Sequence, residues 1–181
     1  MGAFILLEIV VNYLVLPYSN TSGQWSYRDP KGRFSVDYPY GWSEVKPSVD
    51  KGIIQFDSRV FGFKSDPAYS IVICIGPVHE LTNGSLKELY EQYVTNGINT
   101  DPNFQIIKLD EYNNYKIDGQ KGVSWTYRAS KDGGFLDTLI VASIFNGTSF
   151  YAELISKPDS LDLVVPLFNQ TIASLNVTRV L

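Results

Sequence analysis

The sequence predicts a single α+β domain in which a central antiparallel β-sheet is flanked by helices. Most of the chain consists of short apolar or alternating segments bounded by Gly, Pro, Asn and Asp, which is typical of strands. Two segments instead repeat apolar residues at helical spacing. A chain of 181 residues, 44% of them hydrophobic, can bury one substantial core, and no interdomain linker or internal repeat is visible.

The strands are expected in two groups, one before and one after the first helical segment. They cover residues 32–39, 51–56, 71–75, 104–109, 112–117, 122–129, 136–145 and 149–155. The run at 71–75 is apolar throughout, which predicts a strand covered on both faces. Asp118-Gly119 and Asn146-Gly147 are pairs favoured in tight turns, so the last two strands are expected to form a hairpin across residues 146–147.

Two helices are expected. In the first, Ser85 and Glu88 form a capping box at the start, and Gly97 supplies the stop. The second begins its regular part at Pro166, because proline is tolerated in a first helical turn. The apolar stripes are Leu86, Leu89, Tyr90, Tyr93 and Val94 in the first helix and Leu161, Val164, Val165, Phe168 and Ile172 in the second.

Residues 27–42 read Tyr-Arg-Asp-Pro-Lys-Gly-Arg-Phe-Ser-Val-Asp-Tyr-Pro-Tyr-Gly-Trp. This order of an aromatic residue, a glycine, Phe-Ser and Tyr-Pro-x-Gly-Trp resembles the start of PsbP-like domains. Residues 168–175, Phe-Asn-Gln-Thr-Ile-Ala-Ser-Leu, are similar to the closing helix of that family. The resemblance covers nearly all of residues 25–177, and it implies a PsbP-like α/β/α sandwich.

The resemblance also implies a function class, that of non-enzymatic accessory proteins. Plant members of the family assist the oxygen-evolving side of photosystem II and have been linked to calcium or manganese retention, while a distant cytosolic and nuclear relative binds the small GTPase Ran. The family's proposed metal ligands include histidine, but no local motif of this chain matches them. We therefore expect an exported, prokaryotic-type binding module, and a Ca- or Mn-binding accessory protein is the alternative.

The N-terminal segment predicts export. Residues 4–16 are almost entirely apolar, broken only by Glu8 and Asn12. This run is shorter than the roughly twenty residues that span a bilayer, which favours a cleaved signal peptide over a permanent anchor. A buried first strand or helix is the alternative. The expected boundaries are a signal peptide or N-terminal membrane anchor at 1–19, a linker at 20–24, the domain at 25–177 and a tail at 178–181.

Glycosylation sequons point in the same direction. The pattern Asn-x-Ser/Thr without a central proline occurs at Asn20, Asn83, Asn146, Asn169 and Asn176. Asn146 also begins a favoured turn pair, so its sequon has a purely structural alternative. Together with the N-terminal segment, the sequons predict an extracytoplasmic location, either secreted or anchored at the cell surface.

The charge pattern narrows the class of partner. The formal net charge is −4, and Lys and Arg do not cluster beyond isolated pairs. Nucleic-acid binding is therefore not expected, and membrane association is expected through the N-terminal segment only. The expected partner is therefore a protein at the membrane or cell envelope.

Few residues are suited to catalysis. His79 is the only histidine and lies in a predicted loop, so a small hydrolase built on it is a remote alternative. Cys74 is the only cysteine and is expected to be a small core residue rather than a reactive thiol. No phosphate loop, nucleophile elbow or His/Cys metal pair occurs, so neither an enzyme nor a cofactor is predicted.

Two further groups of residues have open interpretations. Asp101, Asp110 and Glu111 either bind a hard cation such as Ca²⁺ or are ordinary solvated carboxylates, and their spacing favours the second. The tryptophans either form a carbohydrate-stacking platform or fill the core, and the core is favoured. They are Trp25, Trp42 and Trp125.

One loop is a candidate partner-binding site. Between the strands at 51–56 and 71–75, Phe61 and Phe63 are surrounded by polar turn residues, with Arg59 and Lys64 beside them. Exposed rings on such a loop would serve as aromatic anchors for a partner. The alternative is an edge hairpin whose two rings share a face and pack on the sheet, and it is favoured because aromatics two residues apart usually serve a core.

Overall fold

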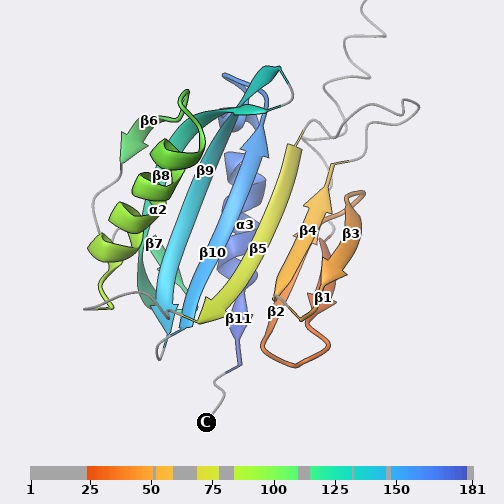
Figure 1. Cartoon of the computed structure of the whole chain (residues 1–181). Coiled ribbons are helices and arrows are strands. Elements are labelled where there is room, and N and C mark those ends of the chain that lie inside the picture. The colour runs from red at the N-terminus through yellow and green to blue at the C-terminus, as the bar shows by residue number, and fades with distance from the viewer. Residues whose placement is uncertain are drawn as a thin grey trace, which may run out of the picture.

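The computed structural model confirms the α+β class (Figure 1). The structure describes residues 24–50, 52–58, 69–77, 84–109, 115–131, 133–145 and 148–178. Within these residues no helix is long and apolar enough to cross a membrane.

The main sheet is antiparallel throughout and contains eight strands. Its order is β3 (Ser43–Ser48), β4 (Ile53–Asp57), β5 (Tyr69–Pro77), β10 (Thr148–Ser156), β9 (Gly134–Phe145), β8 (Gln120–Lys131) and β6 (Gln105–Leu109), with β7 (Tyr115–Ile117) also pairing with β8. The predicted hairpin is confirmed, because β9 and β10 pair from Phe145 and Thr148 onward. The turn between β7 and β8 is also as predicted, with positive φ at Asp118 and Gly119.

A second sheet joins the two ends of the described chain. It contains β1 (Gln24–Arg28), β2 (Phe34–Pro39) and β11 (Asn176–Val177), all antiparallel. The backbone amide of Thr178 continues this pairing by donating to the Arg33 carbonyl at 2.8 Å. Strands β1, β3 and β11 were not expected from the sequence.

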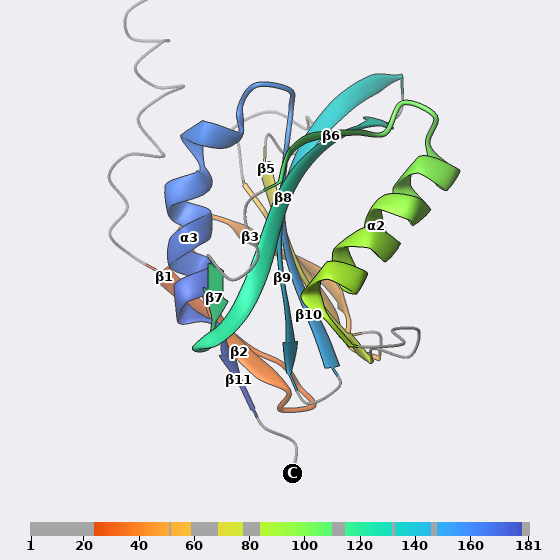
Figure 2. The same cartoon turned by 90° about the vertical axis from the view of Figure 1, so that its left-hand side faces the viewer.

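The helices lie on opposite faces of the main sheet (Figure 2). Helix α2 (Leu86–Thr100) covers one face, and α3 (Val165–Ser174), preceded by the short 3-10 helix η1 (Leu161–Leu163), covers the other. Pro166 lies in the first turn of α3, as predicted. This arrangement of layers agrees with the sandwich implied by the sequence resemblance.

Each face of the sheet has its own apolar core. The larger core lies between the main sheet, the small sheet and α3, and its fully buried side chains include Phe34, Phe56, Ile71, Leu154 and Phe168. The smaller core lies under α2 and is built on Trp125, which is 0% exposed. The interior is therefore divided unequally, with most buried side chains on the α3 side.

The start of α2 is as predicted and its end is not. The hydroxyl of Ser85 accepts a hydrogen bond from the Glu88 amide at 3.1 Å. Gly97 was expected to stop the helix, but α2 continues to Thr100. The glycine is needed for a close approach instead: a Cβ at this position would lie 2.5 Å from the Phe104 ring.

The segment that resembles the PsbP-like start is held by a buried ion pair. Asp29 is 3% exposed and accepts from Arg33 Nε and Nη2, both at 2.7 Å, and from the Arg33 backbone amide at 3.1 Å. Arg33 also donates to the Val49 carbonyl at 2.7 Å. The pair therefore fixes the β1–β2 turn against the loop that follows β3.

Candidate functional site

Helix α2 covers only part of its sheet face. Over β8 and β9 the side chains facing α2 are completely buried, namely Val123, Trp125, Ile140 and Ala142. In Figure 1, α2 lies in front of β8, whereas β5 and β10 have no helix in front of them. The strands β4 and β5 therefore present a face that no described element covers, and β10 lies at its border, where Tyr151 contacts Tyr93 of α2.

We call this surface the open face. Its half-buried side chains are Ile53, Gln55, Asp57, Val72, Cys74, Tyr151, Glu153 and Ile155. On the opposite side of the same strands, residues such as Ile73 and Leu154 are completely buried. The expectation that the strand at 71–75 is covered on both faces is therefore wrong for Val72 and Cys74, because α2 does not extend over β5.

Glu153 of β10 lies where the open face meets the part of the sheet that α2 covers. In the sheet register it lies between Val72 of β5 and Ile140 of β9. Within the described part of the chain no side chain or backbone amide donates a hydrogen bond to its carboxylate, and no cation pairs with it. Burial among these neighbours disfavours the charged form and raises the pKa of Glu153 to about 7.

Three tyrosines border Glu153 on the side of α2. The Tyr93 hydroxyl of α2 donates to the Tyr127 hydroxyl of β8 at 3.1 Å. The Tyr93 ring centroid is 5.8 Å from that of Tyr127 and 6.1 Å from that of Tyr151. Burial raises the pKa of all three hydroxyls, that of Tyr151 to about 12, and the charge of Glu153 adds to this effect. The tyrosines are therefore neutral, and they surround one group that can carry a charge.

Asp57, the other carboxylate of the open face, has partners within the sheet. It accepts hydrogen bonds from Gln55 Nε2 and from Ser70 Oγ, both at 2.7 Å. Its Oδ1 atom is therefore held by one residue of its own strand and one of the neighbouring strand β5. Glu153 differs from it because its neighbours across the sheet are apolar.

Cys74 lies beside Tyr151 on the open face and is half-buried rather than a core residue. Burial, followed by the charge of Glu153, raises the pKa of the Cys74 thiol. A nucleophilic cysteine requires a lowered pKa, so this environment is the opposite of an activated thiol.

Of the three carboxylates considered as a cation site, only Asp101 lies in the described part of the chain. Asp101 accepts from the Asn103 amide at 2.9 Å, the Ser130 amide at 2.6 Å and the Ser130 hydroxyl at 2.8 Å. These bonds lower the pKa of Asp101 and connect the end of α2 to β8. Asp110 and Glu111 lie outside the described residues, and no group of three or more metal-ligating side chains occurs among those described.

The tryptophans have two different environments. Trp42 and Trp125 are buried, as expected, whereas Trp25 is 44% exposed. The Trp25 ring packs edge-on against Tyr40, with ring centroids 5.2 Å apart. A platform of three stacked rings is therefore not formed.

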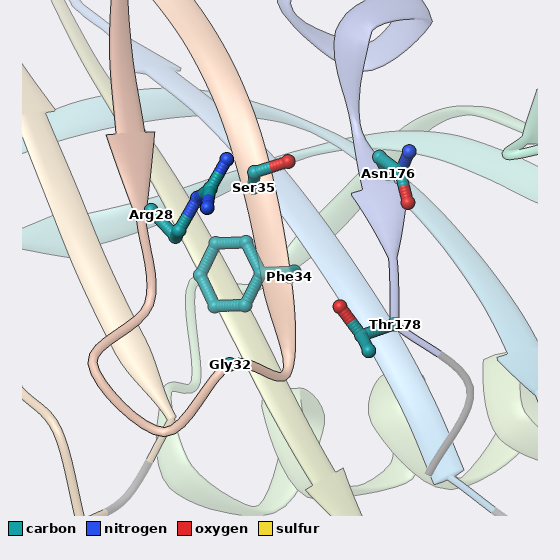
Figure 3. A pocket seen from close by; sticks show the side chains of 6 residues that line it. All are labelled: Arg28, Gly32, Phe34, Ser35, Asn176 and Thr178. Atoms are coloured by element: carbon teal, nitrogen blue, oxygen red, sulfur yellow. The ribbon is translucent and has the colours of Figure 1, made fainter.

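An open hollow of about 340 Å³ lies on the small sheet. Figure 3 shows that adjacent strands contribute Arg28, Ser35 and Asn176 to its lining, with Thr178 beside them. Among the described residues that line it, Arg28 alone is charged, and its side chain is exposed to solvent. A single solvated guanidinium offers little affinity for an anion, so the hollow is a weaker candidate than the open face.

Of the predicted sequons, two lie in described segments. Asn169 of α3 and Asn176 of β11 are both exposed, and Asn169 Oδ1 accepts from the Tyr115 hydroxyl at 3.3 Å. The remaining sequons, at Asn20, Asn83 and Asn146, lie outside the described residues. So does the predicted partner loop with Arg59, Phe61, Phe63 and Lys64, and so does His79.

Glu153 was missed by sequence analysis, although a signal for it existed. In residues 149–155, the alternation that buries Phe150, Ala152 and Leu154 places Tyr151 and Glu153 on the opposite face. The pattern does not reveal that a helix starting at Leu86 would contact β10 only at its border, through Tyr93 and Tyr151, and leave β5 uncovered. The site depends on that helix position, which is a tertiary feature.

Comparisons with solved structures reveal the same fold in several proteins. The solution structure of cyanobacterial PsbP (CyanoP) from Synechocystis matches at 19% identity and a TM-score of 0.59, covering 88% of this chain and 95% of that one. The Ran-binding protein Mog1p of Saccharomyces cerevisiae matches at 11% identity and a TM-score of 0.61, covering 86% and 95%. LpqN of Mycobacterium tuberculosis, involved in cell envelope biogenesis, matches at 13% identity and a TM-score of 0.54, covering 86% and 91%.

No family model and no curated protein sequence matches the chain. The structural likeness confirms the fold that residues 27–42 and 168–175 predicted, which is the PsbP/Mog1 α+β fold.

Proposed function

We propose, from the PsbP/Mog1 fold of this chain, that the protein is an exported, non-catalytic accessory module that binds a protein partner through the open face. The observation that carries the proposal is the incomplete cover of the sheet by α2. It leaves tyrosines half-buried beside the half-buried carboxylate of Glu153, which has no partner among the described residues. Half-buried aromatic and polar groups of this kind become fully buried when a bound partner excludes water from them.

The neighbours of this fold support a binding role. Mog1p is a Ran-binding protein, and LpqN is involved in cell envelope biogenesis. The apolar residues 4–16 and the sequons favour the second setting over the first, so we place the protein outside the cytoplasm, assisting a membrane or envelope complex.

Photo-crosslinking tests where the partner binds. A benzoylphenylalanine at Gln55 lies on the open face, and the same residue at Gln170 lies exposed on α3, on the opposite side of the sheet. We expect the Gln55 variant to give one dominant protein adduct in the native host and the Gln170 variant to give none. Identical adducts from both positions, or adducts from Gln170 alone, would remove the open face as the binding surface.

The absence of catalysis has its own test. The purified protein should show no hydrolytic or redox turnover that depends on His79 or Cys74. An activity that disappears in His79→Ala or Cys74→Ala, while the circular dichroism spectrum is unchanged, would contradict a purely binding role.

The location outside the cytoplasm is tested by mass spectrometry of the native N-terminus and by cell fractionation. We expect the chain either to begin after the apolar segment or to be retained in the membrane. Recovery of intact residues 4–16 in a soluble cytoplasmic form would end the export proposal and would leave the binding face unaffected.

A further inference from the structure

We propose that Glu153 and the tyrosine rings beside it form a binding site for one organic cation, an alkylammonium or guanidinium group. The inference rests on the proposed function, because it names the chemical group that the partner of the open face presents. A Lys or Arg side chain of a protein and a free amine offer the same chemistry, and the experiment below separates these two sources.

The first argument is the missing partner of Glu153. The residue is half-buried, its cross-strand neighbours Val72 and Ile140 are apolar, and no described residue supplies a hydrogen bond or a positive charge. A buried carboxyl group costs free energy to ionise unless a cation pairs with the carboxylate that forms. A cation that arrives from outside supplies the missing charge at a position that solvent can still reach.

The second argument is the group of aromatic rings. The ring centroids of Tyr127 and Tyr151 lie 5.8 and 6.1 Å from that of Tyr93. Each of the three rings is close enough to Glu153 for the charge of Glu153 to raise the pKa of its phenol. Aromatic faces attract ammonium and guanidinium groups within about 6 Å of the ring centroid. A carboxylate bordered by neutral rings thus combines the two attractions that an organic cation requires.

A metal ion fits this place less well. Ca²⁺ takes six to eight oxygen ligands and Mg²⁺ takes about six. The described groups that interact with the charge of Glu153 are the neutral tyrosine hydroxyls and the Cys74 thiol. The described residues also contain no group of three or more metal ligands. One carboxylate with neutral rings selects a singly charged organic group.

Binding of a cation is coupled to the proton on Glu153. Because the free carboxyl is half protonated near pH 7, the cation has to displace a proton at lower pH. The other titratable groups around it, Tyr93 of α2, Tyr127 of β8, Tyr151 of β10 and Cys74 of β5, all have raised pKa values and remain neutral. The affinity should therefore fall by about tenfold between pH 8 and pH 6, through Glu153 alone.

The experiment is an NMR titration of the full chain with n-butylammonium and n-propylguanidinium, with n-butanol as the neutral probe. The backbone amides of β5 and β10 report binding. We expect both cations to shift these amides, n-butanol to leave them in place, and the affinity to show the pH dependence above. Glu153→Gln should weaken cation binding by about tenfold or more and remove the pH dependence.

Glu91→Gln is the matched control, because it removes one negative charge from the exposed side of α2, where Glu91 pairs with Lys87. It should bind the cations as the unmodified chain does. Equal binding of n-butanol and n-butylammonium, unchanged affinity in Glu153→Gln, or a Glu153 carboxyl that titrates at or below its usual 4.5 in the free protein would overturn the proposal.

The source of the cation follows from combining the two experiments. If Glu153→Gln also lowers the yield of the Gln55 protein adduct, the cation belongs to the protein partner. If small cations bind but no protein adduct forms, the site stands as a receptor for a free amine and the proposed protein-binding function fails. A Gln55 adduct that is insensitive to Glu153→Gln, together with no cation binding, would retain the proposed function and reject the cation site.

Discussion

Three carboxylates of this protein differ in whether hydrogen bonds from an arginine offset the cost of burying their charge. Asp29 and Asp137 are each 3% exposed, and each is held by an arginine through two hydrogen bonds. These bonds lower the pKa of both groups despite their burial. Glu153 lacks such a partner among the described residues, so burial alone acts on it and its pKa rises. The cost of burying a negative charge is therefore offset by an arginine at Asp29 and Asp137, which are structural residues. At Glu153 no described residue offsets it, which makes Glu153 a candidate for function.

Glu153→Gln should make stability less dependent on pH. The unfolded carboxyl loses its proton near 4.5, whereas the folded one keeps it up to about 7. Between these values the folded state binds more protons, so the free energy of unfolding falls as pH rises, by a total of about 3 kcal/mol. Urea unfolding should find Glu153→Gln equal to the unmodified chain near pH 4.5 and more stable at pH 8. Parallel stability curves for the two chains would contradict the raised pKa.

Asp29→Asn should be strongly destabilising. The change leaves Arg33, whose side chain is 21% exposed, without its charged partner, and we expect a loss of about 2 to 4 kcal/mol. Because the pKa of Asp29 is lowered in the folded state, its contribution is present above the unfolded value and is lost as pH falls. The variant should therefore lose part of the acid sensitivity of the unmodified chain, as measured by urea midpoints at decreasing pH.

Asp50→Asn provides the control for this comparison. Asp50 pairs with Lys31 at 3.0 Å, but its side chain is 96% exposed. Exposed pairs contribute little, so we expect a much smaller change than for Asp29→Asn. Equal losses of stability in Asp29→Asn and Asp50→Asn would show that the buried pair stabilises the fold no more than the exposed pair.

At the scale of elements, the sequence predicts best where periodicity is uninterrupted. The helix beginning at Leu86 and the hairpin of β9 and β10 follow from long, regular patterns. Strand β3 was missed because Pro47 and a register shift between Val45 and Ser48 break its alternation. Strand β11 has only two residues and is defined by its partner β2, so no local pattern could reveal it.

Gly97→Ala tests why a glycine occurs inside α2. In a helix interior, alanine is normally more stabilising than glycine by about 1 kcal/mol. Here the new Cβ would lie 2.5 Å from the Phe104 ring, which is stacked on Tyr127 with centroids 4.8 Å apart. We expect a net loss of about 1 to 2 kcal/mol, because the ring has to move.

Thr95→Ala is the matched comparison, since residue 95 is exposed on the same helix. It should stabilise the protein by a few tenths of a kcal/mol, roughly the difference in helix propensity. If urea unfolding finds Gly97→Ala as stabilising as Thr95→Ala, the close approach of Phe104 is not a constraint.

At the scale of the whole molecule, the fold was predictable and the site was not. Residues 27–42 and 168–175 indicated the fold. They contain strand β2, most of α3 and the buried pair of Asp29 and Arg33, which lie on one side of the sandwich. The open face instead depends on how far α2 extends across the sheet. That distance is set by the packing of Leu89, Tyr90 and Tyr93 on Trp125, contacts between residues far apart in the sequence.

The small sheet leads to a prediction about the ends of the chain. Both ends of the described residues are bound to β2: β1 pairs along its whole length, and β11 and Thr178 pair on its other side. A chain of residues 24–178 should therefore have the same urea midpoint as the full chain. A chain that ends at Leu175 should lose about 2 to 4 kcal/mol, because it gives up the buried Val177 and the backbone bonds of β11. If removal of residues 1–23 costs as much as removal of β11, then the N-terminal segment is part of the folded domain and is neither a signal peptide nor a linker.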